Sequence, residues 1–142
     1  MDNKKLVIFI CHGNICRSPI AEYIAKHLDK EGKYRYLSRA VSNEERGNDI
    51  YPPMKRVLIQ YKIPYDRHAA QKISLEEFKE AEYIFVMDKS NMNYLRMLFP
   101  YENFSKVRML EEFEIEDPWY TGNYEWVFRL IYEAIEKFLE KE

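Results

Sequence analysis

The 142-residue sequence has few cysteines, no excess of positive charge and no long apolar run. Its two cysteines, Cys11 and Cys16, are too few for the disulfide framework of a small secreted domain, which favours a reducing compartment. A formal net charge of -2 lacks the basic footprint of a nucleic-acid-binding protein. The apolar run at residues 6–10 is shorter than a signal-peptide core of ~7–15 residues and far shorter than a bilayer span of ~20. We therefore expect a cytoplasmic protein that binds neither nucleic acid nor membrane.

Metal ligands are also scarce in this sequence. The two cysteines and three scattered histidines supply no set of four ligands at structural-zinc spacing, so we expect no metal and no cofactor. The chain has no internal repeat and no low-complexity linker, and its length suits one domain with a proper hydrophobic core. We expect that domain to span residues 1–142 and to act as a monomer.

Strand-like and helix-like patterns alternate along the chain. Strands are predicted at residues 6–10, 34–41, 83–87 and 105–109, and helices at 18–31, 52–61, 74–81, 90–98 and over the C-terminal stretch. The last helix is the clearest, because its apolar residues recur on one face: Val127, Leu130, Ile131, Ala134, Ile135, Phe138 and Leu139. Right-handed crossovers then predict a single doubly wound α/β domain with a four-stranded parallel sheet flanked by helices.

The segment between the first strand and the first helix has the features of an anion site. Gly13 and Asn14 both tolerate a positive φ, so the loop can curl until its backbone N–H groups converge on one point. Ser18 followed by Pro19 is typical of a helix N-cap and first helical position. The N-terminus of that helix adds unpaired N–H groups and a positive dipole end. The sequence therefore predicts a site for a phosphate-sized anion at this edge of the sheet.

Cys11 and Arg17 bracket this loop. A helix N-terminus and a nearby cation favour the thiolate form of a cysteine, which makes Cys11 a candidate nucleophile. Arg17 supplies a planar guanidinium that can bind two phosphate oxygens at once. Taken singly, the cysteine could be a small buried hydrophobic residue and the arginine a solvated one. The strand, the loop, the two side chains and the helix together favour a functional site.

The loop resembles the signature loop of the low-molecular-weight protein tyrosine phosphatases. The resemblance covers nearly the whole chain and rests on three motifs in family order, at residues 11–22, 87–91 and 117–120. It implies an enzyme that hydrolyses phosphotyrosine and aryl phosphates through a phosphocysteine on Cys11, with Arg17 holding the phosphate. It also implies that the rest of the loop binds the substrate, namely His12, Gly13, Asn14, Ile15, Cys16 and Ser18.

Asp117 is the candidate general acid. Displacing a phenolate from phosphorus requires a proton for the leaving oxygen, and a carboxyl group in a partly dry site can carry one. An Asp-Pro pair is also common in turns, where the aspartate serves only as a cap. Trp119 and Tyr120 are the bulky aromatics expected to stack on a phenyl ring. The resemblance implies that Asp117 donates the proton.

The resemblance further implies a polar network that keeps Asn14 in a left-handed conformation. Its other members here are Ser18, Ser38 and His68, although Ser38 and His68 alone would be interpreted as a strand-edge hydroxyl and a surface loop residue. We also expect Ser18 to cap the first helix and to offer its hydroxyl to Cys11. Asp88, at the carboxyl end of a strand, is expected to cap a helix or to support the site.

Two positions depart from the family pattern. Glu44 stands where the family often carries an aromatic wall, so it could repel acidic peptides or bind a basic one. His12 replaces a residue that is commonly apolar, and it either adds a titrating group beside the thiolate or faces solvent.

Three other functions use a similar loop. Thioredoxin-coupled arsenate reductases pass the oxidation to further cysteines, but no cysteine follows Cys16 in this chain. A phosphocysteine carrier subunit of a sugar transport system needs neither Asp117 nor an aromatic wall, and a silent phosphate-binding module needs no thiol at Cys11. The resemblance implies phosphotyrosine-containing proteins as the partners.

Overall fold

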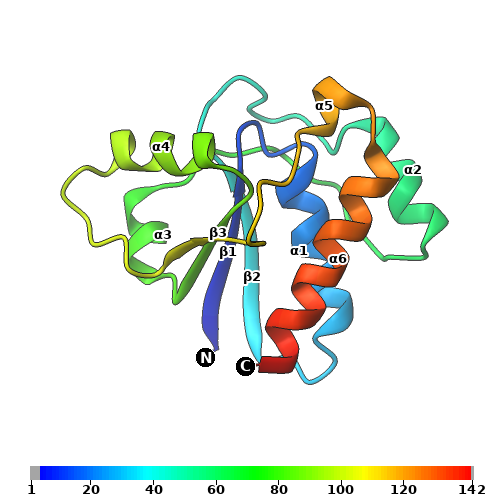
Figure 1. The fold of residues 1–142 in the computed structure, drawn as a ribbon, viewed down its shortest axis with the longest axis horizontal. Coiled ribbons are helices and arrows are strands. Elements are labelled where there is room, and N and C mark those ends of the chain that lie inside the picture. Colours follow the sequence, from blue (N-terminus) through cyan, green and yellow to red (C-terminus); the bar gives the residue numbers. More distant parts are fainter. Residues whose placement is uncertain (1–3, 142) are drawn as a thin grey trace.

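The computed structural model describes residues 4–141, so residues 1–3 and 142 of the expected domain lie outside the described part. Figure 1 shows a central sheet with helices on both sides. The strands are β1 (Lys5–Cys11), β2 (Tyr34–Ala40), β3 (Tyr83–Val86) and β4 (Val107–Met109). All pairs are parallel and the order is β2-β1-β3-β4, which confirms the predicted four-stranded parallel sheet.

β1 is the central strand, and it carries the site. Its last six residues are all buried, because β2 and β3 pair with its two edges and helices cover both of its faces. Alternate side chains enter two separate cores, with Phe9 on one face and Ile8 on the other. A continuous apolar run is typical of a strand covered in this way. Cys11, its last residue, is thereby fixed at the carboxyl edge of the sheet.

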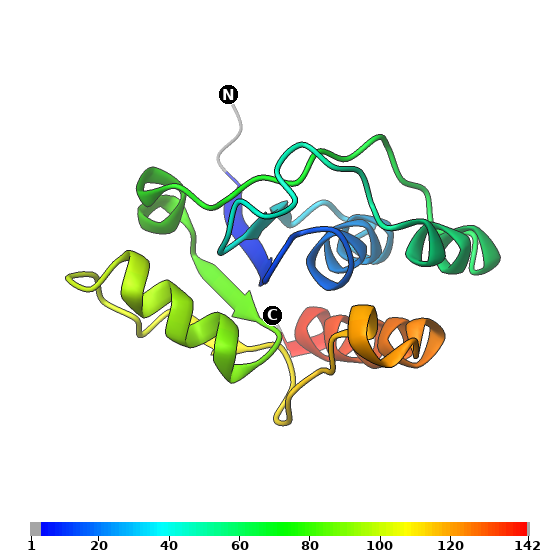
Figure 2. The ribbon, with the colours of Figure 1, turned by 90° about the horizontal axis from the view of Figure 1, so that it is seen from above.

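The helices divide between the two faces of the sheet. Figures 1 and 2 show α1 (Arg17–Leu28), α2 (Pro52–Gln60) and α6 (Tyr124–Lys141) on one side. The other side is covered by α3 (Leu75–Glu80) and α4 (Lys89–Leu98). A short helix, α5 (Pro118–Thr121), directly precedes α6. The predicted apolar stripe of α6, apart from Ala134, packs into the same core as α1.

The start of α1 differs from the prediction. The first helix begins at Arg17 and ends at Leu28, whereas the sequence predicts residues 18–31. Its N-cap position is Cys16 and no side chain caps it, so the prediction that Ser18 caps this helix is wrong. The reason is that Ser18 lies inside the first turn, where its backbone N–H donates to Cys11 Sγ. An uncapped first turn leaves N–H groups available to an anion.

Candidate active site

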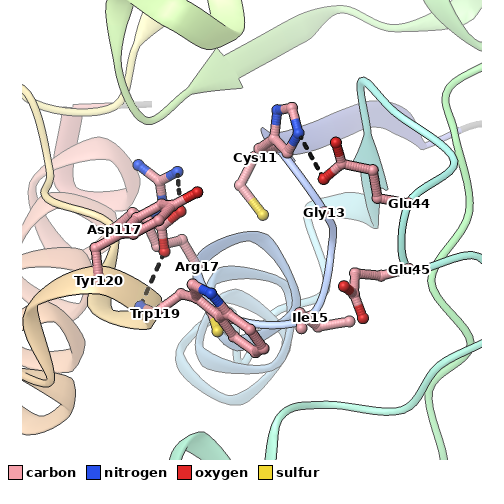
Figure 3. A pocket seen from close by; sticks show the side chains of 11 residues that line it. Cys11, Gly13, Ile15, Arg17, Glu44, Glu45, Asp117, Trp119 and Tyr120 are labelled. Atoms are coloured by element: carbon pink, nitrogen blue, oxygen red, sulfur yellow. Dashed lines mark hydrogen bonds and ion pairs between the residues drawn. The ribbon is translucent and has the colours of Figure 1, made fainter.

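Residues 12–16 join β1 to α1 and curl around the space in front of Cys11, as Figure 3 shows. Asn14 has a φ of 61°, the left-handed conformation expected for this loop. Its Nδ2 donates to Ser18 Oγ at 2.7 Å, and its Oδ1 accepts from Gln71 N at 3.1 Å. His68 Nε2 donates to the Asn14 carbonyl oxygen at 2.6 Å. The structure therefore brings Asn14, Ser18 and His68 together, and their hydrogen bonds hold the curl of the loop.

Ser38, the other residue expected in this network, has a different partner. Its hydroxyl donates to Glu22 Oε1 at 2.7 Å, and Glu22 also accepts from Lys26 Nζ at 2.6 Å. Among the described hydrogen bonds none joins Ser38 to Asn14. The carboxylate of Glu22 is the stronger acceptor for this buried hydroxyl. Ser38 thus ties β2 to α1 and supports the loop only indirectly.

A second layer of support comes from Asp49 behind His68. Asp49 Oδ1 accepts from the backbone N–H groups of His68 and Ile50, and its Oδ2 accepts from Lys55 Nζ at 2.5 Å. Burial alone would raise the pKa of Asp49, but these hydrogen bonds and the charge of Lys55 lower it to about 2. The carboxylate therefore stays ionised and fixes the segment that presents His68 to Asn14.

The sulfur of Cys11 meets two donors from Ser18. Ser18 Oγ lies 3.0 Å from Cys11 Sγ, and the Ser18 backbone N–H donates to the same sulfur at 3.4 Å. Because Ser18 Oγ already accepts from Asn14, its own proton is free to point at the sulfur. Donors at a helix N-terminus stabilise negative charge. The arrangement suits a thiolate nucleophile.

Arg17 is the most deeply buried charged side chain of the site, with 2% of its surface exposed. Its Nη1 donates to Asp88 Oδ2 and to the Ile115 carbonyl oxygen, both at 2.8 Å. Burial alone would lower the pKa of Arg17, but the negative charges of Cys11, Asp117 and Asp88 raise it. Its Nε is buried without a hydrogen-bond partner among the described residues. A buried, permanently charged group with an unused donor is suited to bind an anion.

Asp88 combines the two roles expected of it. Its Oδ1 accepts from Asn91 N at 2.9 Å in a capping box at the start of α4, while its Oδ2 accepts from Arg17. The carboxylate is thus held by the helix and in turn aligns the guanidinium.

Asp117 faces the same space from the other side, as Figure 3 shows. It is the N-cap of α5, where its Oδ1 accepts from Trp119 N at 3.0 Å. Its Oδ2 lies 3.5 Å from Arg17 Nη2. Asp117 therefore caps a helix, as expected for an Asp-Pro turn, and the same side chain is the candidate acid.

The pocket in front of Cys11 has a volume of about 220 Å3 and two unlike walls. Trp119 and Tyr120 form an aromatic wall, and Glu44 and Glu45 lie opposite (Figure 3). His12 Nε2 lies 3.1 Å from Glu44 Oε2, so the departures from the family pattern contact each other. The full lining is Cys11, His12, Gly13, Ile15, Cys16, Arg17, Glu44, Glu45, Asp117, Trp119 and Tyr120.

Cys16 lines this pocket with chemistry unlike that of Cys11. It is 4% exposed, and burial together with the negative charges of Cys11 and Asp117 raises the pKa of its thiol well above the usual range. Cys16 is therefore a neutral thiol, and both cysteines are free in the structure.

Sequence reasoning missed Tyr51. Its backbone N–H donates to the Ile15 carbonyl oxygen at 2.9 Å, and its ring lies against Trp119. The only local signal is its place before Pro52, which marks it as a helix N-cap but gives no contact with the site.

No group of three or more His, Cys, Asp or Glu side chains within residues 4–141 is placed to hold a metal ion. No helix of the described residues has both the length and the apolar character that a bilayer span requires.

Comparison with known sequences gives a consistent result. Residues 6–142 match the family model described as low molecular weight phosphotyrosine protein phosphatase. The low molecular weight protein-tyrosine-phosphatase YfkJ of Bacillus subtilis is 33% identical, with 94% of this chain and 92% of that protein covered. The low molecular weight protein-tyrosine-phosphatase PtpA of Staphylococcus epidermidis is 30% identical, with 94% of this chain and 91% of that protein covered.

Comparison with solved structures agrees with the sequence matches. The crystal structure of SP-PTP, a low molecular weight protein tyrosine phosphatase from Streptococcus pyogenes, superposes with a TM-score of 0.93 at 33% identity. The match covers 96% of this chain and 92% of that one.

Proposed function

The chain belongs to the low molecular weight phosphotyrosine protein phosphatase family and is a protein tyrosine phosphatase, and we propose that Cys11, Arg17 and Asp117 carry its reaction. One observation supports this proposal most strongly. The Cys11 sulfur, the buried Arg17 guanidinium with its unpartnered Nε, and the Asp117 carboxyl group all line one pocket.

In the first step, Cys11 Sγ attacks phosphorus in line with the bond to the tyrosyl oxygen. A sulfur–phosphorus bond forms while the phosphorus–oxygen bond breaks, and Asp117 gives its proton to the departing oxygen. Arg17 and the backbone N–H groups of residues 12–17 hold the three equatorial oxygens. Tyrosine leaves as a neutral phenol, and a phosphocysteine remains on Cys11.

In the second step, a water molecule attacks the phosphocysteine. The Asp117 carboxylate takes a proton from that water, a phosphorus–oxygen bond forms, and the sulfur–phosphorus bond breaks. Inorganic phosphate leaves, the Cys11 thiolate is restored, and Asp117 is again protonated for the next cycle.

The walls of the pocket fit an aromatic substrate. Trp119 and Tyr120 are 48% and 83% exposed, so apolar ring surface is available to stack on a phenyl group. His12 and Glu44 border the same pocket, so we expect them to contact the residues next to a phosphotyrosine.

The rival functions fit the site less well. A phosphoryl carrier has no use for a general acid, which is the role we propose for Asp117. A thioredoxin-coupled reductase needs further cysteines, and Cys16 is the last cysteine of the sequence.

The expected substrates are phosphotyrosine-containing proteins. We extend the proposal to a cytoplasmic, monomeric enzyme that binds neither nucleic acid nor membrane.

The assignment of Cys11 is tested by Cys11→Ser. We expect this variant to lose hydrolysis of aryl phosphates and phosphotyrosine peptides, because a serine hydroxyl is a much weaker nucleophile than a thiolate. It should still bind inorganic phosphate, measured by calorimetry, since Arg17 and the backbone N–H groups remain. Acid quenching of the unmodified enzyme during turnover should place a phosphoryl group on the peptide that contains Cys11. Substantial turnover by Cys11→Ser would contradict the proposal.

A further inference from the structure

The segment that carries the acid, residues 116–123, has one buried side chain, that of Pro118, and few polar or aromatic contacts with the rest of the protein. Trp119 is 48% exposed. Among the hydrogen bonds, ion pairs and ring contacts of the described residues, two connect a side chain of this segment to the remainder. They are the Arg17–Asp117 pair and the contact between the rings of Tyr51 and Trp119. The proposed chemistry accounts for the first of these contacts and leaves the second unexplained.

Tyr51 contacts the phosphate-binding loop and the acid segment at once. Its backbone N–H donates to the carbonyl oxygen of Ile15 at 2.9 Å. Its ring centroid lies 4.7 Å from that of Trp119, with an angle of 50° between the planes, and 6.0 Å from that of Tyr124. These separations lie in the range where aromatic rings attract each other. Tyr51 therefore links the two halves of the active site.

The backbone that carries the Tyr51 ring is restricted in conformation. Tyr51 is the N-cap of α2, with φ of -57° and ψ of 130°, and Pro52 and Pro53 follow it. A residue before proline is restricted to extended conformations, and proline is pre-organised for the first turn of a helix. The ring thus projects toward Trp119 from a stiff helix start.

Trp119 is coupled in turn to the acid. The Trp119 backbone N–H donates to Asp117 Oδ1 at 3.0 Å, while Asp117 Oδ2 lies 3.5 Å from Arg17 Nη2. The bond from Trp119 sets the orientation of the carboxyl group, so a displacement of this residue also turns the carboxyl away from the leaving oxygen.

We propose that Tyr51 is a positioning residue, which holds Trp119 as the aromatic wall and, through Trp119, keeps Asp117 over the Cys11 sulfur. Tyr51 does not line the pocket in front of Cys11, so it acts only through its neighbours. The inference rests on the proposed role of Asp117 as general acid.

The test compares Tyr51→Ala and Tyr51→Phe with the matched control Tyr61→Ala. Tyr61 caps the other end of α2, and its ring stacks on Phe128 with centroids 4.6 Å apart, but it does not line the pocket. The control therefore removes a comparable aromatic contact from the same helix without touching the acid segment.

We expect Tyr51→Ala to lower kcat/KM for a phosphotyrosine peptide about three- to tenfold, the loss that corresponds to one aromatic pair. The loss should be smaller for an aryl phosphate with an activated leaving group, which needs little protonation. Tyr51→Phe should stay within about twofold of the natural enzyme, because it keeps the ring. Tyr61→Ala should lose thermal stability but leave the ratio between the two substrates unchanged.

A double-mutant cycle separates this inference from the assignment of the acid. In an Asp117→Asn background, Tyr51→Ala should no longer change the ratio between the two substrates. If Asp117→Asn alone has no leaving-group-dependent effect, the assignment of the acid fails. If Asp117→Asn shows that effect but Tyr51→Ala lowers both substrates equally, the positioning role of Tyr51 is refuted.

A direct measurement reports on the wall itself. The chain contains two tryptophans, so Trp126→Phe leaves Trp119 as the only indole. In that background, Tyr51→Ala should increase quenching of Trp119 fluorescence by acrylamide, and Tyr51→Leu gives a second test if the alanine variant folds poorly. Unchanged quenching in a folded variant would overturn the inference.

Discussion

Replacing Asp117 by asparagine separates its proposed chemical role from its structural one. Asparagine caps helices about as well as aspartate. Its side-chain oxygen can still accept from Trp119 N, as Asp117 Oδ1 does at 3.0 Å. The variant should therefore keep α5 in place and lose only the ability to donate a proton.

The size of the effect follows from the leaving group. Tyrosine leaves through an oxygen with a pKa of about 10, so its departure as an unprotonated phenolate is slow at neutral pH. General acid catalysis contributes a factor of about 100 to 10,000, equivalent to about 2.7 to 5.4 kcal/mol of activation free energy. The protonated carboxyl group of Asp117, 3.5 Å from Arg17 Nη2, and the amide of asparagine are both neutral, so binding of the phosphate should change little. We therefore expect kcat to fall within that range while KM does not rise.

The assay is a series of aryl phosphates whose phenols differ in acidity, measured under steady-state conditions. Asp117→Asn should slow the least acidic phenol most and the most acidic phenol least. Glu116→Gln is the matched control, because it neutralises an adjacent carboxylate that accepts from Asn123 and does not line the pocket. Equal losses across the series would show that Asp117 positions the loop and does not donate the proton.

Three further predictions concern redox chemistry, specificity and stability. Mild peroxide should oxidise the Cys11 thiolate to a sulfenic acid, which condenses with the Cys16 thiol to a disulfide and water. Dithiothreitol should then restore activity; peptide mapping that finds Cys11 as sulfinic or sulfonic acid with Cys16 free would exclude this switch. Glu44→Gln should reduce the preference for a basic over an acidic residue beside phosphotyrosine about two- to fivefold at low salt, since an exposed ion pair is weak; an unchanged ratio of kcat/KM values would contradict it. The lowered pKa of Asp49 means that its contribution to stability is complete above about pH 4 and is lost as the pH falls toward 2. Urea unfolding of Asp49→Asn should show a smaller loss of stability over that interval than the natural protein shows.

The fold and the placing of Cys11 beside Arg17 could be predicted because their signals are local in the sequence. An apolar run of five residues predicts the buried strand β1, and the short loop after it keeps Cys11 and Arg17 together. The Asp-Pro pair at Asp117 predicts a helix cap, which the structure shows as the start of α5. Each of these depends on neighbours within a few positions.

Contacts between distant elements could not be predicted in the same way. Arg17 donates hydrogen bonds to Asp88 and Ile115, which lie 71 and 98 positions further along the chain. No spacing in the sequence encodes such pairs. The prediction that Ser18 caps α1 is also wrong. The backbone N–H of Ser18 donates to Cys11 Sγ, and the helix starts one residue earlier than predicted. These contacts are set by how helices pack on the sheet.

The groups that we propose to bind phosphate and those that we propose to face the rest of the substrate come from different parts of the molecule. Cys11 lies on β1 and Arg17 on α1, and both are almost completely buried, whereas the walls lie on the largely exposed segments 42–47 and 116–123. Mutations in exposed segments cost little stability, while mutations in a buried core cost much more. Natural selection can therefore retune which phosphoproteins are recognised without rebuilding the reaction centre. With Asp117 kept, the same separation gives a protein engineer two short surface stretches to randomise.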